Sequence, residues 1–357
     1  MNEFKDLISQ VKKNCDISDA KYWGTFSICG LLLRLRELYR SENNIKHYHK
    51  ISTRDIGEWI NYKEKLWKEL EGEEFKDIQI NGNRYSPFEI NNINQILKNN
   101  KLLYGAGLGV HSKPIFFLAE LISNKTIKDI KIYIAGKEYA RDLSDNPAMV
   151  QDRTIIGRTE LAKMLIWQRF EEFRCSKSKL ALTYAFTQYG ISSEEEPSEK
   201  LDRLITDIAH SEIESYIYHE IGEIFEGEKI GDSWKKLLQN ISNTKSEIFA
   251  RAIKDILSDT SDKGMLKHII KKQKYGSLAF YLVFLSGFRK TLFNEIFEAF
   301  NKFISQNDWD IIDKARVKAY KKAYAYAEKL IDLNNNTHKK EELVEEINKI
   351  IKKDFNL

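Results

Sequence analysis

Proline and cysteine are both scarce in this chain, which has 4 prolines and 3 cysteines in 357 residues. Because proline breaks helix interiors, its scarcity favours long helices. The cysteines, Cys15, Cys29 and Cys175, form no CxxC pair and are odd in number. That pattern argues against a disulfide framework and a structural zinc site. We therefore expect unpaired thiols and a cytoplasmic protein.

The chain also lacks a long apolar run and an excess of charge of one sign. Its longest apolar stretches, "GTFSICGLLL" and "SLAFYLVFLSGF", are well short of the roughly twenty residues that a spanning helix needs. The first residues, "MNEFKDLISQVKKN", carry charges where a signal peptide has an apolar segment. Lysine and arginine number 57 against 53 acidic residues, and the net charge of +4 is spread along the chain. These features predict no membrane span and do not favour nucleic acid as a partner.

The length and composition predict a globular protein of two domains. A chain of 357 residues exceeds the size at which a single core usually stops growing. Hydrophobic residues make up 42% and charged residues 31%, which argues against extensive disorder. An irregular segment, "SDNPAMVQD", precedes a change of pattern, so we place the boundary near residue 150 and expect domains at 1–150 and 151–357.

In the first half the periodicity predicts helices and two hairpins. Asn81-Gly82 and Ala135-Gly136 each lie between short alternating runs, a pattern typical of β-hairpins. Apolar periodicity predicts helices over 18–41, 53–72 and 88–99, and the run "IFFLAELI" predicts a buried helix at 115–122. The first of these helices is apolar on nearly every side and is expected to be central.

From Thr154 onward the sequence contains no pattern that we identify as a strand. The period of 3.6 residues predicts helices over 154–175, 178–189, 197–226, 231–241, 245–259, 263–273, 277–305, 309–333 and 339–353. The expected fold is therefore mainly α: two helical domains, with small hairpins in the N-terminal half and an all-helical bundle in the C-terminal half.

The segment "YIYHEIGEIFEGE", residues 216–228, contains the strongest candidate site. On a helix, Glu220 falls in the middle of an apolar stripe, and His219 and Glu223 stack along the edge of that stripe. Glu226 and Glu228 point elsewhere and are expected to be solvated. A carboxylate inside an apolar stripe requires a cation, a hydrogen-bond network or a metal.

Two interpretations of this segment remain open. In the first, His219, Glu220 and Glu223 belong to an acid–base site or bind a divalent metal, with His219 and Glu223 as ligands. In the second, they form ion pairs with an arginine of a neighbouring helix. "HEIGE" lacks the second histidine of the zinc-protease HExxH motif, and the Glu-x-x-His pairs of di-iron bundles are absent.

Three further residues are candidates outside this segment. Arg158 falls within the apolar face of its predicted helix, where it either covers apolar surface or meets a buried glutamate or an anionic ligand. Glu120, inside "IFFLAELI", is either a buried carboxylate or lies at a partly exposed helix edge. Lys113 follows the glycine-rich "YGAGLGVHS", which fails the Walker A and dinucleotide spacings and is either a flexible connection or a weak anion-binding loop.

Four blocks together resemble a bacterial family of proteins without assigned function. They are "CDISDAKYWGTFSICGLLLRLRELYR", "LLYGAGLGVHSKPIFFLAEL", "YARDLSDNPAMVQDRTIIGRTEL" and "YHEIGE". The resemblance implies N-terminal and C-terminal parts that cover nearly the whole chain. It implies no activity, substrate or catalytic residue.

Two functional hypotheses follow. The first is a helical enzyme with a site between its two halves, built from Glu120, Arg158, His219, Glu220 and Glu223 with or without a metal. The second is a binding or scaffold protein in which the buried charges are structural, with a protein or small molecule as partner.

Overall fold

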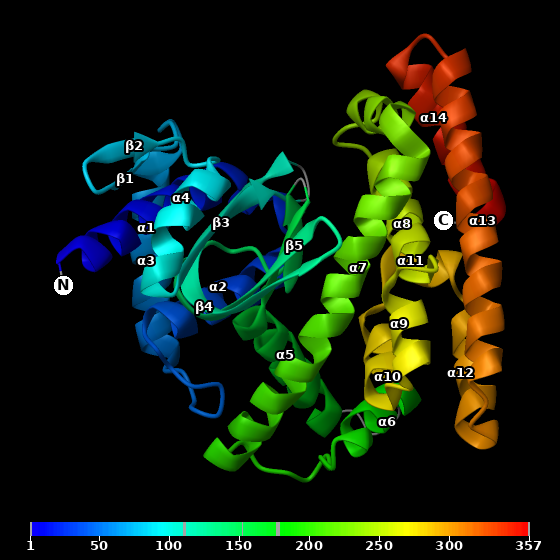
Figure 1. The fold of residues 1–357 in the computed structure, drawn as a ribbon, viewed down its shortest axis with the longest axis horizontal. Helices are drawn as coiled ribbons and strands as arrows, with labels where there is room; N and C mark the ends of the chain where they lie inside the picture. The colour runs from blue at the N-terminus through cyan, green and yellow to red at the C-terminus, as the bar shows by residue number, and fades with distance from the viewer. Residues whose placement is uncertain (1, 110–111, 152, 176–178, 356–357) are drawn as a thin grey trace. The chain divides into compact units, whose positions relative to one another are not determined.

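The computed structural model describes residues 2–109, 112–151, 153–175 and 179–355. The chain divides into two compact units (Figure 1). The first unit comprises Met1–Glu171 and Glu195–Ile213, and we call it the sheet unit. The second comprises Glu172–Glu194 and Glu214–Leu357, and we call it the helical unit.

A five-stranded mixed sheet organises the sheet unit. Its strand order is β3-β4-β5-β7-β6, in which β5 and β7 are parallel and the other neighbours are antiparallel. A separate antiparallel pair is formed by β1 and β2. The strands are β1 (Ile78–Ile80), β2 (Asn83–Tyr85), β3 (Leu102–Leu108), β4 (Pro114–Ile127), β5 (Ile130–Arg141), β6 (Ala148–Gln151) and β7 (Thr154–Arg158).

Both faces of the sheet are covered at its centre. On one face, Phe116 and Leu118 of β4 pack in a core cluster with Leu7, Val11 and Cys15 of α1. On the other face, neighbouring residues of β4 pack with residues of β5, β6 and β7. The helices of this unit are α1 (Asn2–Tyr22), η1 (Trp23–Thr25), α2 (Ile28–Glu42), α3 (Thr53–Leu70), α4 (Ile90–Leu97), η2 (Lys98–Asn100), most of α5 (Thr159–Cys175) and the first part of α7 (Glu199–Asn240).

The prediction of a buried helix at 115–122 is wrong, because this segment belongs to β4. Residues 115–119 are all buried, since packing covers this strand on both faces. A strand buried on both faces has a continuous apolar run instead of alternation. Periodicity alone cannot distinguish such a run from a buried helix.

The glycine-rich segment before Lys113 is also not a flexible connection, because most of it forms β3. A Cβ atom at Gly105 would lie 2.1 Å from the ring of Phe117, which is its cross-strand partner. A Cβ atom at Gly107 would lie 2.5 Å from Cε of Met149. The glycines therefore make room for large neighbours inside the sheet. Val110 and His111 of this segment lie outside the described residues.

The predicted hairpin at Ala135-Gly136 is wrong as well, because both residues lie inside the continuous strand β5. The chain reverses earlier, between β4 and β5, where Lys128 has a φ of 56°. The other predicted hairpin is confirmed: Asn81 and Gly82, with φ of 52° and 77°, connect β1 to β2.

The helix predicted over 18–41 is two helices, α1 and α2, separated by the 3₁₀ turn η1. The hydroxyl of Ser27 caps α2 by accepting a hydrogen bond from the amide of Gly30. Ile28 is 80% exposed and Leu32 is 54% exposed. Neighbouring elements therefore do not cover α2 on every side, although its apolar composition predicted a central helix.

The mainly-α prediction is therefore wrong, and the chain has an α/β fold. The sheet continues past the expected start of the all-helical half, because β7 covers Thr154–Arg158. This short strand shows no alternation of buried and exposed residues, because Ile155, Ile156 and Gly157 are all buried. The alternation that indicates a strand is therefore absent from its sequence.

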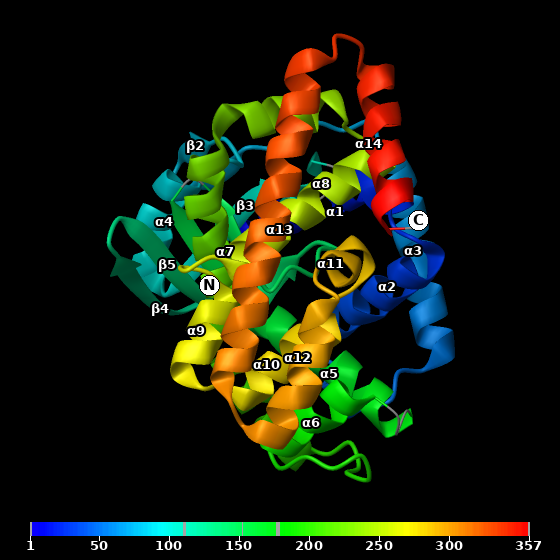
Figure 2. The same ribbon diagram turned by 90° about the vertical axis from the view of Figure 1, so that its right-hand side faces the viewer.

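Helices make up the described elements of the helical unit. The long helix α13 lies beside α8 and α12 (Figure 2). A glycine interrupts α7 near its end, because Gly231 has a φ of 69° and a ψ of −162°. Besides the later part of α7, the helices are α6 (Leu180–Gln188), α8 (Lys245–Thr260), α9 (Met265–Lys272), α10 (Tyr275–Phe284), α11 (Gly287–Leu292), α12 (Glu295–Gln306), α13 (Trp309–Asn336) and α14 (Lys340–Phe355).

The prediction about the cysteines is confirmed. All three are free thiols, with Cys15 buried and Cys29 and Cys175 exposed. Cys15 donates its S–H to the carbonyl of Phe116 at 3.1 Å, which connects α1 to the sheet.

Candidate functional site

Two helices of the helical unit bring five acidic or imidazole side chains together. His219, Glu220 and Glu223 lie on α7, and Asp255 and Asp259 lie on α8. His219 and Glu223 are four residues apart, as are the two aspartates, so each pair lies on one face of its helix. The hydroxyl of Thr244 caps the start of α8 by accepting from the amide of Glu247.

Gly222 allows these two helices to approach closely. A Cβ atom at this position would lie 2.3 Å from the carbonyl oxygen of Ser258, which is backbone and cannot rotate away. A Cβ atom at Gly264 would lie 1.8 Å from the same oxygen. In the structure, Gly222 is what lets α8 lie against the His219 and Glu223 face of α7.

His219 and Asp259 form the central pair of the cluster. The Nδ1 atom of His219 lies 2.7 Å from Oδ1 of Asp259. The other carboxylate oxygen of Asp259 accepts a hydrogen bond of 2.7 Å from Nη2 of Arg289, on α11. The Asp259 side chain is fully buried, and that of His219 is 20% exposed. A buried carboxylate thus holds the orientation of the imidazole, which leaves Nε2 for a ligand.

The surrounding charges control the protonation of this pair. Burial opposes the charged imidazolium, but the carboxylates of Asp259, Glu220 and Asp255 together outweigh it and raise the pKa of His219 to about 10. Burial also opposes ionisation of Asp259, yet Arg289 and His219 hold the pKa of its carboxyl below its usual range. Without a further ligand, the pair is therefore an imidazolium and a carboxylate.

The remaining carboxylates differ in their environments. Glu223 accepts a hydrogen bond of 2.7 Å from Nζ of Lys254, and this ammonium and His219 lower the pKa of Glu223 against the opposing effect of burial. Burial raises the pKa of Asp255, although Nε of Arg289 lies 3.8 Å from its Oδ2.

Glu220 is half-buried and differs from both. Within the described chain it has no hydrogen bond or ion pair, and Arg289 pairs with Asp259 instead. Burial is the main cause that raises the pKa of Glu220 to about 7, and the neighbouring carboxylate of Glu223 adds to it. A carboxyl group that titrates near neutrality and has no partner is suited to accept or donate a proton.

Three of these residues are arranged as potential metal ligands. One nitrogen of His219 and one carboxylate oxygen each of Glu223 and Asp255 lie within 4.8 Å of one another. Ligands around a first-row ion at about 2.0–2.2 Å are separated by about 3–4 Å, so small side-chain rotations would bring the set to coordination distance.

The charge of the cluster also fits a divalent cation. With His219 neutral, as a ligand must be, and with all four carboxylates ionised, the two described cations that pair with them, Lys254 and Arg289, leave two negative charges uncompensated.

Sequence reasoning missed the residues of α8 and α11. Asp255 and Asp259 follow the same four-residue spacing as His219 and Glu223, within "AIKDILSDT", and the method applied to α7 would have detected them. Arg289 lies on a helix of six residues, where no periodicity is visible.

The expectation that Glu226 is solvated is wrong. This residue is 7% exposed, and its carboxylate accepts a hydrogen bond of 2.8 Å from the hydroxyl of Tyr320 on α13. Glu228 is exposed, as expected.

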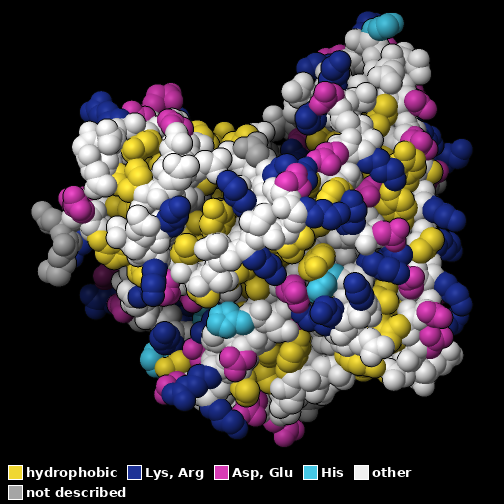
Figure 3. Space-filling model, viewed as in Figure 1, with side chains coloured by type: hydrophobic (Ala, Val, Ile, Leu, Met, Phe, Trp, Pro, Cys, Tyr) yellow, Lys and Arg dark blue, Asp and Glu magenta, His cyan; other side chains and the backbone are white. Residues whose placement is uncertain are grey.

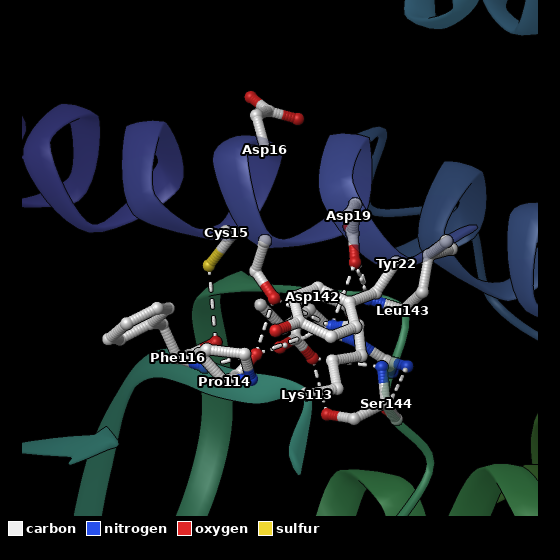
Figure 4. A network of polar contacts seen from close by, with 12 residues as sticks. Cys15, Asp16, Asp19, Tyr22, Lys113, Pro114, Phe116, Asp142, Leu143 and Ser144 are labelled. Carbon is white, nitrogen blue, oxygen red and sulfur yellow. Dashed lines mark hydrogen bonds and ion pairs between the residues drawn. The ribbon is translucent and has the colours of Figure 1, made fainter. Parts of the chain in front are cut away.

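Lys113 belongs to a buried network in the sheet unit (Figure 4). Its Nζ lies 3.1 Å from Oδ1 of Asp19 and 3.1 Å from Oδ2 of Asp142, and donates to the hydroxyl of Ser18 at 3.0 Å. Burial raises the pKa of Asp19 to about 7, against the opposing effect of Lys113. The lysine thus connects the start of β4 to α1 and to the segment after β5, and its charge is compensated by these aspartates.

Arg158 and Glu120 also lie in the sheet unit. The guanidinium of Arg158 is fully buried and donates two hydrogen bonds, of 2.6 Å and 2.9 Å, to the carboxylate of Glu138. It also stacks over the ring of Phe117, 4.0 Å from the ring centre. Glu120 lies on β4 opposite Leu102, and its side chain is exposed. The structure therefore brings His219, Glu220 and Glu223 together with α8 and α11 and places the other three candidates in the sheet unit. There Arg158 and Lys113 belong to one buried network, because Arg158 donates to the hydroxyl of Ser144, Ser144 donates to Asp142, and Asp142 pairs with Lys113.

Charges of both signs are mixed on the face shown in Figure 3. Lysine and arginine side chains lie among those of aspartate and glutamate there. Among the described residues, no helix has both the length and the apolar character that crossing a bilayer requires.

The fold and the site define a protein with an α/β sheet unit and a helical unit that carries a His–Asp–Arg cluster among carboxylates. Two family models match the chain, "Family of unknown function (DUF6866) N-terminal domain" over residues 6–158 and the corresponding C-terminal domain over residues 163–354. The chain belongs to this family. No curated protein and no solved structure matches it.

Proposed function

We propose that the helical unit binds a divalent metal ion through His219, Glu223 and Asp255, and that this centre catalyses a hydrolytic reaction. The observation that carries the proposal is the convergence of one imidazole and two carboxylates within 4.8 Å on two closely packed helices. Imidazole and carboxylate ligands together suit zinc, manganese and iron(II).

The residues around these three have roles that such a centre requires. Asp259 accepts the Nδ1–H of His219 and so fixes the ring, as the outer carboxylate of a carboxylate–histidine–metal arrangement does. Glu220 adjoins the ligands without being one, and its pKa of about 7 allows it to take a proton from water near neutral pH. The ion, when bound, lowers the pKa of a coordinated water.

The alternative is that the cluster is a structural ion-pair network in a binding or scaffold protein. The pairs Lys254–Glu223 and Arg289–Asp259, each at 2.7 Å, support it. It leaves the carboxylate of Glu220 half-buried without a hydrogen bond in the described chain, although the charges of His219 and Lys254 act on it.

Metal binding to the full chain decides between these proposals. We expect Mn²⁺ or Zn²⁺ to bind with a stoichiometry of one in calorimetry and to raise the melting temperature, and chelator to reverse the shift. A ligand at a hundredfold excess over its Kd stabilises a folded protein by about 2.7 kcal/mol. The double substitution Glu223→Gln and Asp255→Asn should abolish the effect, whereas Glu328→Gln, at an exposed position of α13, should leave it unchanged. Absence of binding to the wild-type chain at millimolar metal would favour the ion-pair network.

A further inference from the structure

One edge of the sheet, formed by the second half of β4, has no neighbouring strand within the described chain. β3 ends opposite Glu120, whereas β4 continues to Ile127 with β5 as its partner on the other side. Residues 122–126 are all exposed, and Ile122 is 49% exposed. We call residues 122–127, which present this open side to solvent, the β4 edge.

Backbone groups of the β4 edge point away from β5. The N–H of Lys131 on β5 donates to the carbonyl of Arg153, beside β7, at 2.9 Å. Because hydrogen-bonded and non-hydrogen-bonded pairs alternate along antiparallel strands, Lys131 and its β4 partner Thr126 do not bond to each other. The N–H and C=O of Thr126 and, two residues earlier, of Asn124 therefore point to the open side. No residue of the described chain hydrogen-bonds to them there.

Exposed lysines surround the β4 edge. Lys125 lies in its middle, and Lys128 lies in the turn that follows. Lys101 lies at its other end, where the carbonyl of Lys101 accepts a hydrogen bond from the amide of Leu121. A strand that pairs with this edge therefore lies beside lysine side chains. Opposite charges that face each other across two strands stabilise the pairing, and like charges destabilise it.

The two carboxylates nearest to the β4 edge in sequence are directed away from its open side. Asp129 pairs with Arg153, with 2.5 Å between Oδ2 and Nε. Oε2 of Glu120 would lie 3.1 Å from a Cβ atom at Gly136, so this carboxylate lies over β5. The open side therefore favours an acidic partner.

We infer that the β4 edge binds an extended acidic segment of another protein, which joins the sheet as an added strand. An edge strand with unpaired backbone groups is a template for such an addition. The N–H and C=O groups of Asn124 and Thr126 hold the backbone of the segment, and Lys125, between them, faces an aspartate or glutamate side chain. The inference is independent of the proposed metal centre, which lies in the helical unit.

A second copy of this chain fits the same edge less well. If two copies pair as antiparallel strands about a two-fold axis, one register places Lys125 opposite Lys125, where like charges repel. A shift by two residues avoids this contact but places Ile127 of the second copy opposite Leu121. Lys101 already occupies that position. Charge and space therefore favour a different chain as the partner.

The charge preference is tested by the binding of short labelled peptides to the full chain, measured by fluorescence anisotropy. One peptide alternates valine with glutamate, and the other alternates valine with lysine. We expect the glutamate peptide to bind and the lysine peptide to bind about tenfold more weakly or less. Lys125→Glu should lower the ratio of the two affinities by about tenfold, because it weakens binding of the first peptide and strengthens binding of the second.

The backbone pairing is tested by Thr126→Pro. Proline removes the N–H that points to the open side and leaves the hydrogen bonds between β4 and β5 in place, as proline on an edge strand does. It should weaken binding of the glutamate peptide by about fivefold or more. The control, Thr126→Ala, should bind the peptide as the wild type does. Should Thr126→Pro fail to fold, a glutamate peptide with methylated backbone amides replaces it and should bind more weakly by the same factor.

The other outcomes overturn the inference. If the glutamate peptide does not bind at millimolar concentration, or if Thr126→Pro binds it as the wild type does, the β4 edge does not accept an added strand from an acidic segment. Binding of a DNA duplex that Lys125→Glu weakens and Thr126→Pro leaves unchanged would identify nucleic acid as the partner of these lysines. A wild-type dimer that Thr126→Pro converts to a monomer would identify a second copy as the occupant.

Discussion

The Nδ1 atom of His219 lies 2.7 Å from Oδ1 of Asp259, although forty residues separate the two along the chain. The pair forms because α7 and α8 approach through Gly222, whose missing side chain accommodates the carbonyl of Ser258. The orientation of the His219 imidazole depends on that approach. The same approach determines that Asp259 can pair with both His219 and Arg289 and that Asp255 lies near His219.

Gly222→Ala should therefore destabilise the protein and disrupt the cluster. A methyl group 2.3 Å from backbone forces the helices apart, and overpacking of this kind costs about 1–3 kcal/mol or more. Gly227→Ala on the same helix is the control, since a Cβ atom there meets only the Lys254 side chain at 3.9 Å. That substitution should be neutral or stabilise by up to about 1 kcal/mol, because alanine favours the helix. Equal melting temperatures for the two variants would contradict the close packing.

Metal affinity should rise with pH. In the metal-free chain the pKa of His219 is about 10, so a metal must displace its proton at neutral pH. Between pH 6 and 9 we expect the Mn²⁺ affinity to increase by about tenfold per pH unit. Calorimetry in buffers of different ionisation enthalpy should detect the release of about one proton at pH 7. A pH-independent affinity would show that His219 is not a ligand.

Glu220→Gln should flatten the pH dependence of stability. Because the folded-state pKa of Glu220, about 7, exceeds its ordinary value of 4.5, its contribution is fully present below pH 4.5 and is lost as the pH rises to 7. Up to about 2–3 kcal/mol of this pH dependence should disappear in the variant, as urea unfolding at pH 4.5 and 7.5 would measure. Glu328→Gln should retain the wild-type profile. The variant removes no ion pair with an arginine, because Arg289 pairs with Asp259.

Glu226→Ala should cost about 1–2 kcal/mol, because it removes the acceptor of the Tyr320 hydroxyl from a buried position. From the sequence alone this side chain was expected to be solvated. Glu328→Ala, at an exposed position, should stay within about 0.5 kcal/mol of the wild type. Chemical denaturation of the two variants compares them directly, and equal midpoints would contradict a structural role for Glu226.

Lys113→Met should destabilise the sheet unit without affecting metal binding. It leaves Asp19 and Asp142 buried without their shared cation, and loss of one partner of a buried ion pair typically costs about 3–5 kcal/mol. Lys125→Met, at an exposed position of β4, is the matched control and should remain near wild type. A well-folded Lys113→Met variant with normal stability would mean that the network is not structural, and would reopen an anion-binding role for this lysine.

Local features were determined by the sequence itself. Asn81-Gly82 predicted the hairpin of β1 and β2, because few residues other than asparagine and glycine adopt positive φ at low cost. The spacing of His219 and Glu223 predicted a shared face on α7, since helical geometry places residues four apart together. The odd number and spacing of the cysteines predicted free thiols.

Only the tertiary structure decided which segments form the sheet and which residues complete the site. Phe116 and Phe117 lie in a strand that is covered on both faces. Their segment is therefore continuously apolar and lacks the alternation of apolar and polar residues by which strands are recognised in a sequence. Asp259 and Arg289 meet His219 through helix packing, which depends on contacts between residues far apart in sequence. The partner of a buried charge is determined by such packing, and no local periodicity encodes it.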